Sequence, residues 1–167
     1  MRNIELKARL GDLERAEAVC REIGAVFQTD LRQVDTYFVV ASGRLKLREN
    51  GPGKCELIHY CRTDEAASKV SDYKIVPGSA ELRELLAAAL GVRCVVRKVR
   101  GLWLWENVRI HLDTVEGLGT FLEFEAVLGE QFDDADGYGK VARLREAFGI
   151  GDKDLVECSY VDLILDI

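Results

Sequence analysis

The stretch Asn3-Ile4-Glu5-Leu6-Lys7-Ala8-Arg9 decides the fold, because its apolar and charged residues alternate with the period of a β-strand. In an extended chain Ile4, Leu6 and Ala8 share one face, and the residues between them form a ladder of polar and charged side chains on the other face. The apolar face predicts a core on that side of the strand. The charged ladder is typical either of a solvated sheet face or of a barrel lumen that holds a charged ligand.

Length and composition bound the class of protein. The chain has 167 residues, of which 48% are hydrophobic and 31% are charged, so we expect one globular domain over residues 1–167. Its net charge of −6 argues against a nucleic-acid partner, and no apolar run approaches the ~18 residues of a membrane span. The five scattered cysteines form no C-x-x-C pair and no signal peptide opens the sequence, which favours a cytoplasmic protein with reduced thiols.

Turn signals and apolar periodicity divide the chain into strands and helices. We expect strands over residues 3–10, 33–40, 44–48, 54–63, 71–76, 92–101, 107–115 and 120–127. Residues 25–32 are strand-like with a bend at 28–30, Gly101 predicts a turn before a strand over 102–105, and 64–69 predict an exposed loop. Helices are expected over 12–23, 79–90 and 133–148, while the tail 159–165 fits either a strand or a short helix. Short antiparallel strands of this number favour a barrel or a sandwich with flanking helices, in the α+β class.

Charged faces recur on the later strands. In Arg44-Leu45-Lys46-Leu47-Arg48 the leucines share one face and three cations share the other. Across all predicted strands, the cations on such faces are Lys7, Arg44, Lys46, Arg48, Arg62, Lys98 and Arg100, and the anions are Glu5, Asp113, Glu123 and Glu125. Burying an isolated ion costs several kcal/mol, so a lumen built from these faces would need solvent or a charged ligand. Lysine and arginine suit phosphate oxygens, and clustered carboxylates suit Mg²⁺ or Mn²⁺.

The pair Glu123-x-Glu125 is the most informative single motif. A spacing of two on a strand turns both carboxylates to the same side, where they repel each other unless a cation neutralises them. A solvated pair would satisfy this requirement with water. Because Glu5 and the cationic strands accompany the pair, we interpret it as part of a metal site.

These motifs together resemble the CYTH superfamily, the triphosphate tunnel metalloenzymes. The resemblance runs through Glu5-x-Lys7, Arg44-x-Lys46-x-Arg48, Lys98-x-Arg100, Asp113 and Glu123-x-Glu125, in that order, from residue 3 to the tail. It implies a closed antiparallel β-barrel tunnel of about eight strands with flanking helices. The segments Asp35-Thr36-Tyr37-Phe38, Ser71-Asp72-Tyr73 and Ser159-Tyr160-Val161-Asp162-Leu163 look most like the class IV adenylyl cyclase branch.

The resemblance also implies roles. Lys7, Lys98 and Arg100 would be catalytic, all seven cations would bind the substrate, and Glu5, Asp113, Glu123 and Glu125 would bind Mg²⁺ or Mn²⁺. The substrate would be a small-molecule triphosphate, with neither nucleic acid nor membrane as partner, and the protein would be a monomer or homodimer. A cyclase would convert ATP to cyclic AMP and pyrophosphate. The alternatives are a triphosphatase acting on tripolyphosphate, thiamine triphosphate or nucleotides, and a module that only binds polyphosphate.

One departure keeps these alternatives open. The opening motif of the family is E-x-E-x-K, whereas this chain has Asn3-x-Glu5-x-Lys7. An amide oxygen can ligate a metal ion, but it carries no charge and cannot act as a base. His111 fits either a proton shuttle or a hydrogen-bonded lumen residue. The aromatic residues Phe38, Tyr60, Tyr73 and Trp103 fit either a surface for stacking a base or ordinary packing.

Overall fold

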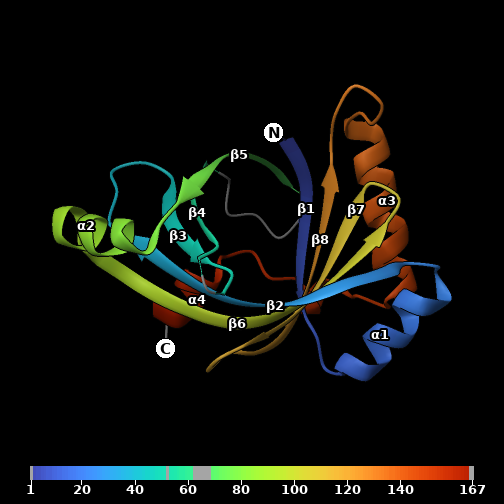
Figure 1. Cartoon of the computed structure of the whole chain (residues 1–167). Coiled ribbons are helices and arrows are strands. Elements are labelled where there is room, and N and C mark those ends of the chain that lie inside the picture. Colours follow the sequence, from blue (N-terminus) through green and yellow to red (C-terminus); the bar gives the residue numbers. More distant parts are fainter. Residues whose placement is uncertain (1, 52, 62–68, 166–167) are drawn as a thin grey trace.

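The structure, a computed structural model, describes residues 2–51, 53–61 and 69–165, with only the backbone described at 69–72 (Figure 1). Eight antiparallel strands form a closed barrel in the order β1-β5-β4-β3-β2-β6-β7-β8. The strands are β1 (Arg2–Arg9), β2 (Val26–Phe38), β3 (Arg44–Glu49), β4 (Cys55–Cys61), β5 (Lys69–Gly78), β6 (Val92–Trp105), β7 (Val108–Val115) and β8 (Gly119–Val127). The α+β class and the antiparallel barrel predicted from the sequence are therefore confirmed.

Four α-helices of the described residues flank this barrel. They are α1 (Leu13–Glu22), α2 (Ala80–Leu90), α3 (Asp134–Ala147) and α4 (Tyr160–Leu165), and a 3₁₀ turn covers Asp152–Asp154. The side chain of Asp12 caps α1 by accepting a hydrogen bond from the Arg15 amide at 2.9 Å, as expected for an N-cap aspartate. Ser79 stands at the start of α2, but its side chain makes no capping bond. Within the described residues, no helix is both long enough and apolar enough to cross a membrane.

The long strands β2 and β6 connect two sides of the molecule. Figure 1 shows them curving together from α2, beside β3, β4 and β5, to α1 and α3, beside β1, β7 and β8. Their pairing runs from Val26 opposite Leu104 to Phe38 opposite Val92, with a register shift between Phe27 and Thr29. Because the two strands span both sides, side chains on their inner faces reach the middle of the barrel.

Besides a smaller cluster in which Tyr37 and Phe121 pack against α4, the main hydrophobic core lies outside the barrel wall. Apolar residues of β1, β7 and β8 pack there against α1 and α3, with Ile4, Ile110 and Phe124 completely buried. Alternation along each strand then turns the intervening polar residues inward. The apolar side of the opening strand therefore supports the fold, and its charged side lines the interior.

Three local predictions differ from the structure or are decided by it. Gly101 was expected to start a turn, but β6 continues through it, because Gly101 pairs with Asp30 on one side and Leu112 on the other. The predicted bend at 28–30 is the register shift inside β2, which is one strand from residue 26 to residue 38. The tail forms the helix α4 and not a strand. Of the predicted loop, residues 64–68 lie outside the described residues.

Candidate functional site

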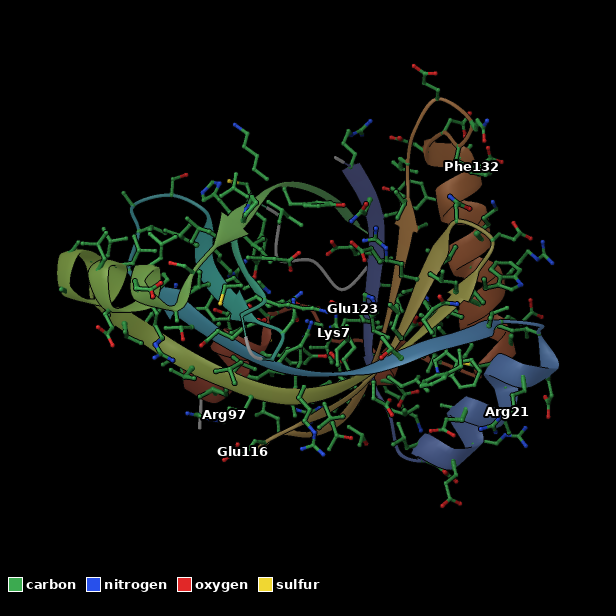
Figure 2. All side chains as sticks on the ribbon, viewed as in Figure 1. Lys7, Arg21, Arg97, Glu116, Glu123 and Phe132 are labelled. Atoms are coloured by element: carbon green, nitrogen blue, oxygen red, sulfur yellow. The ribbon has the colours of Figure 1, made fainter. Side chains whose placement is uncertain are left out.

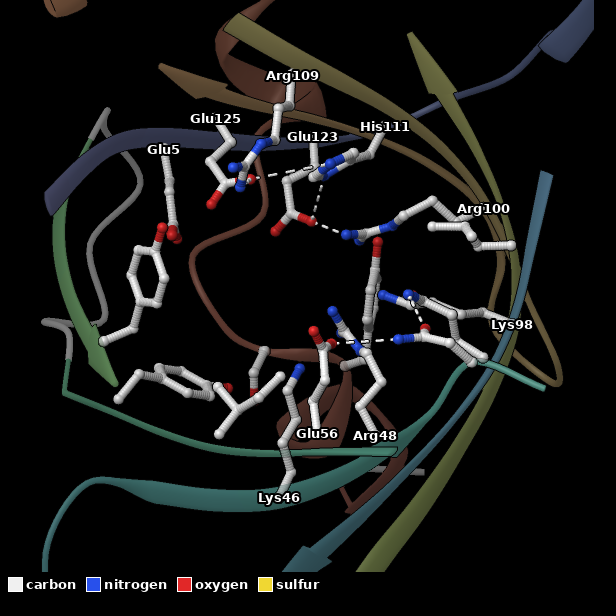
Figure 3. Close-up of a pocket in the computed structure, with 18 of the residues that line it drawn as sticks. Glu5, Lys46, Arg48, Glu56, Lys98, Arg100, Arg109, His111, Glu123 and Glu125 are labelled. Carbon is white, nitrogen blue, oxygen red and sulfur yellow. Dashed lines mark hydrogen bonds and ion pairs between the residues drawn. The ribbon is translucent and has the colours of Figure 1, made fainter. Parts of the chain in front are cut away.

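A cavity of about 520 Å³ occupies the interior of the barrel, within the size range of small-molecule sites (Figure 3). All eight strands contribute to its wall, and residues at the start of α4 add to it. Within the described part of the chain, the charged residues that line it are Glu5, Lys7, Lys46, Arg48, Glu56, Lys98, Arg100, Arg109, Glu123 and Glu125. Most of the site residues predicted from the sequence therefore meet in one cavity.

Cations from β3 form one part of the wall, and a buried carboxylate on β2 holds them. Asp35 pairs with Arg48 across the two strands and accepts hydrogen bonds from its Nε and Nη2, both at 2.7 Å. The same carboxylate accepts a hydrogen bond from Lys46 Nζ at 2.9 Å. Burial alone would raise the pKa of Asp35, but Arg48 and Lys46 lower it well below its usual value. Asp35 is therefore an anion fixed between two cations.

Cations from β6 form a second group with the same design. Asp113 on β7 accepts from Arg100 Nε at 2.7 Å and Nη2 at 2.6 Å, and from Lys98 Nζ at 3.3 Å. The hydroxyl of Tyr160, at the start of α4, donates to the same carboxylate at 2.8 Å. Burial raises the pKa of Asp113, but Arg100 and Lys98 lower it by a larger amount. The pKa therefore lies below its usual value, and the carboxylate stays ionised. Burial and Arg100 lower the pKa of Lys98 to about 7.

Glutamates from β1 and β8 form the opposite part of the wall, at the top of Figure 3. Glu5 pairs with Glu125 across these strands, and Lys7 pairs with Glu123. Lys7 Nζ lies 3.5 Å from Glu123 Oε1, while Arg100 Nη2 donates to Glu123 Oε2 at 2.7 Å. Burial raises the pKa of Glu123, but Lys7 and Arg100 lower it well below its usual value.

Glu125 is held by two neighbours at the edge of the cavity. Arg109 Nη1 donates to its Oε2 at 3.2 Å, and Asn3 Nδ2 donates to its Oε1. Arg109 keeps 41% of its side chain exposed, so it stands at the opening. His111 lies between the glutamates, 3.6 Å from Glu123 and 3.9 Å from Glu125. Burial and Arg100 lower its pKa, so its imidazole is neutral at pH 7.

Among the described residues, the charges of the site nearly cancel. Six cations and four glutamates of these residues line the cavity, and the two aspartates that hold the cations bring the number of carboxylates to six. Such mutual pairing explains how so many ions remain in a barrel interior. It also means that a ligand with several negative charges would need compensating cations of its own.

Several predicted residues lie elsewhere. Asp113, predicted to bind metal, does not line the cavity, because its oxygens face Arg100, Lys98 and Tyr160. Arg44 does not line it either, and its Nη2 donates to Asp162 of α4 at 2.8 Å. Arg62 lies outside the described residues.

The aromatic candidates divide in the same way. Tyr60 and Tyr73 line the cavity, whereas Phe38 and Trp103 are 2% and 5% exposed and belong to the packing of the wall. Sequence reasoning missed Asp35, Arg109 and Glu56 as parts of the site. The inward faces of the strands contain them, since Asp35 faces Arg48 in a hairpin and Glu56 is the next neighbour of Arg48 on β4.

The donor set suits a divalent metal ion in its chemistry. Glu5, Glu123 and Glu125 supply carboxylate oxygens, which hard cations such as Mg²⁺ and Mn²⁺ prefer. The Oδ1 atom of Asn3, completely buried beside Glu125, has no hydrogen-bond partner within the described part of the chain. Among those same residues, no three His, Cys, Asp or Glu side chains already converge as a metal cage. An ion would therefore draw these oxygens together on binding.

Comparisons with known proteins agree with this geometry. The CYTH domain family matches residues 1–160. A Methanocaldococcus jannaschii protein named "Putative adenylate cyclase" is 21% identical over 172 residues, which cover 98% of each chain. The structure of the PH1012 protein from Pyrococcus horikoshii has a TM-score of 0.83 at 24% identity and covers 96% of this chain and 98% of that one.

A protein from Hippeastrum shares the fold as well. It is described as a "putative adenylyl cyclase" with a dominant triphosphatase activity, and its structure has a TM-score of 0.71 at 16% identity. The superposition covers 98% of this chain and 95% of that one. With identities this low, the structural comparisons support the fold, whereas the family match extends over nearly the whole sequence. The chain therefore belongs to the CYTH domain family.

Proposed function

We propose that the protein binds a triphosphate together with a divalent metal ion in this cavity and catalyses transfer of a phosphoryl or nucleotidyl group. One observation carries the proposal: the cations of β3 lie across a single cavity from the glutamates of β8, while Arg100 of β6 lies at the side and contacts Glu123 (Figure 3). Cations of this kind suit phosphate oxygens, and glutamates suit a hard metal ion. The family of the chain supports the same chemistry.

The charge balance of the cavity supports a metal-bound substrate. Because the cations and carboxylates nearly cancel in the described part of the site, these residues give a bare triphosphate no net attraction. A divalent ion held by Glu5, Glu123 and Glu125 would offset the charge of the phosphates. When bound, such an ion supplies Lewis acidity at the phosphate oxygens and helps to orient them. Asp113 supports Lys98 and Arg100 in this proposal and does not bind the metal.

The remaining roles belong to the cations. Lys46, Arg48, Lys98 and Arg100 bind the phosphate oxygens and stabilise the negative charge that moves during transfer. They are held in place before the ligand arrives, so little free energy is lost in arranging them. Lys7, 3.5 Å from Glu123, stands between the glutamates and the phosphates and neutralises both.

A cyclase is favoured by the uncharged part of the wall. Ile58, Tyr60, Tyr73 and Ile75 of β4 and β5 line the cavity and offer a surface for a nucleoside. In this reaction the ribose 3′ oxygen attacks the α-phosphorus of ATP, and pyrophosphate leaves. The name of the Methanocaldococcus relative is consistent with this form.

A triphosphatase is favoured by the neutral histidine beside the glutamates. His111 is buried in the wall and can orient a water molecule near the phosphates without adding charge. Water would then attack the terminal phosphorus, the bond from that phosphorus to the bridging oxygen would break, and the diphosphate would leave, with orthophosphate as the second product. The activity described for the Hippeastrum protein belongs to this class.

A product assay separates these reactions. ATP with Mn²⁺ should yield cyclic AMP and pyrophosphate if the protein is a cyclase, whereas ADP and orthophosphate identify a triphosphatase. Tripolyphosphate with Mg²⁺ reports hydrolysis without a nucleoside. Glu123→Gln removes the charge of a proposed metal ligand and tests its part in product formation. Its matched control is Glu130→Gln, which makes the same change at an exposed position of the chain. Tight binding by calorimetry without any product would contradict catalysis and leave a binding module.

A further inference from the structure

Two carboxylates hold the cationic wall in the same way, and we call each group an aspartate bracket. The first bracket consists of Asp35 with Arg48 and Lys46, and the second of Asp113 with Arg100 and Lys98. In both, the aspartate is the direct cross-strand partner of the arginine. In both, it accepts from Nε and Nη2 of that arginine and from a lysine two residues earlier.

The aspartates lie on the inward faces of β2 and β7, but the cations that they hold cover them. Asp35 is 2% exposed, and it does not line the cavity, whereas Lys46 and Arg48 do. A pair through Nε and Nη2 engages one side of the guanidinium and leaves Nη1 available on the other side. Figure 3 shows Lys46 and Arg48 directed into the cavity. Asp35 therefore acts on groups that meet a ligand and does not meet it itself.

The first bracket is the simpler of the two. Asp113 also accepts from Tyr160, and Arg100 also donates to Glu123, so the second bracket is tied to α4 and to the glutamates. The side chain of Asp35 makes its hydrogen bonds to Lys46 and Arg48. Changing Asp35 consequently tests the cationic wall without disturbing the proposed metal ligands.

We propose that Asp35 is a positioning residue, which keeps Lys46 charged and holds Arg48 with one edge toward the cavity before a triphosphate binds. The inference rests on the proposed function, because it requires a ligand with phosphate groups. Preorganised donors lose little free energy on binding, whereas a mobile arginine and a neutral lysine would bind phosphate less tightly.

The charge of Lys46 gives the role a signature in pH. The groups that act on Lys46 are Asp35 and Tyr37 on β2, Arg48 on its own strand, Tyr60 on β4 and Arg100 on β6. Burial and Arg48 lower its pKa to about 8, although Asp35 raises it. Without Asp35 the pKa of Lys46 falls further, and so does the pKa of Lys98, which Asp35 also raises. Binding that depends on the charge of these lysines is then lost at a lower pH. A purely structural role of Asp35 would not move this midpoint.

The test is calorimetric titration of the whole protein with sodium tripolyphosphate and Mg²⁺ between pH 6 and pH 9. Because charge-assisted hydrogen bonds contribute about 1.5–3 kcal/mol, D35N should raise Kd roughly 10- to 100-fold at pH 7.5. Its loss of binding with rising pH should begin earlier than in the wild type. The matched control is Asp134→Asn, which removes an exposed ion pair with Arg2 far from the cavity and should leave Kd unchanged.

A second pair of variants covers the case in which D35N folds poorly. In K46M/R48M the carboxylate of Asp35 has lost both cations, so adding D35N should raise the free energy of unfolding and leave Kd for tripolyphosphate as it was. If D35N has the Kd and the pH profile of the wild type, the positioning role of Asp35 is overturned, but the proposed function is not. The same conclusion follows if D35N lowers the affinity equally in the wild type and in K46M/R48M. Failure of the wild type to bind tripolyphosphate would overturn the proposed function together with the inference.

Discussion

Replacing Asp113 with asparagine tests whether this carboxylate holds the cationic wall or binds a metal ion. Its Oδ2 accepts hydrogen bonds from Lys98, Arg100 and Tyr160, and its Oδ1 accepts one more from Arg100. In either orientation, the amide of asparagine would point its NH₂ group at one of these donors. The side chain is completely buried, so the two cations would also lose their counter-charge where water cannot replace it.

The expected loss is large compared with the stability of a domain. Removing one partner of a buried ion pair costs roughly 3–5 kcal/mol, out of about 5–15 kcal/mol in total. The difference in free energy of unfolding between the wild type and D113N should also depend on pH. Burial raises the pKa of Asp113, but Arg100 and Lys98 lower it by more and hold the folded-state pKa below the unfolded value of about 3.9. A lowered carboxylate pKa stabilises the fold above that unfolded value, and this contribution is lost as the pH falls through the folded pKa.

Urea unfolding followed by circular dichroism, from pH 7 down to pH 3, measures both effects. The free energy of unfolding of the wild type should exceed that of D113N by the largest amount at pH 7. This difference between the two proteins should become smaller below about pH 4. Asp134→Asn again serves as control, since exposed ion pairs contribute at most about 1 kcal/mol. A gap below 1 kcal/mol at pH 7, or one that does not change with pH, would refute the reasoning. A D113N protein of normal stability that has lost affinity for Mg²⁺ would instead restore the metal-ligand assignment.

Three further predictions concern the core, the glutamates and the uncharged wall. Gly137→Ala should cost about 1–3 kcal/mol in urea unfolding, because its new methyl group would lie 2.8 Å from a β1 side chain, whereas Gly139→Ala, with open space, should gain up to about 1 kcal/mol. The double variant Glu123→Gln and Glu125→Gln should abolish metal-dependent product formation, and full activity would contradict the proposed metal site. Tyr73→Leu should raise KM for ATP roughly 5- to 100-fold through lost stacking, with KM for tripolyphosphate unchanged; a parallel rise in both would show that Tyr73 does not contact a nucleoside.

Alternation along single strands predicted much of the site. The inward faces of β1, β3 and β8 follow directly from a period of two, which places Lys7, Lys46, Arg48, Glu123 and Glu125 on the cavity wall. Local pattern suffices there because one face of each strand must meet the core. The number and spacing of the strands favoured a barrel or a sandwich, and the resemblance to the CYTH superfamily pointed to the closed antiparallel barrel.

The pattern within one strand does not reveal which residue of another strand lies opposite a given side chain, so cross-strand pairs could not be predicted in this way. Asp113 was predicted to bind metal as one of the anions on the charged faces and through the family resemblance, and the cross-strand pairing of the folded chain sets it opposite Arg100. Asp35 received no role, although its partner Arg48 was recognised. Gly101 carries a turn signal, yet pairing on both sides keeps it within a strand. In each case tertiary pairing outweighed a local pattern.

The pairing of β1 with β8 has a consequence for the order of folding. Glu5 and Glu125 become neighbours only when the first strand of the chain meets the last strand of the barrel, and 122 residues separate Asn3 from Glu125. Closing so long a loop is entropically costly and slow. During synthesis β1 can pair with β5 on one side, but its other edge must wait until β8 has left the ribosome, with an apolar face and unpaired backbone exposed in the meantime. The glutamate wall is therefore completed late, and a ligand that bridges these strands would act on the final step of barrel closure.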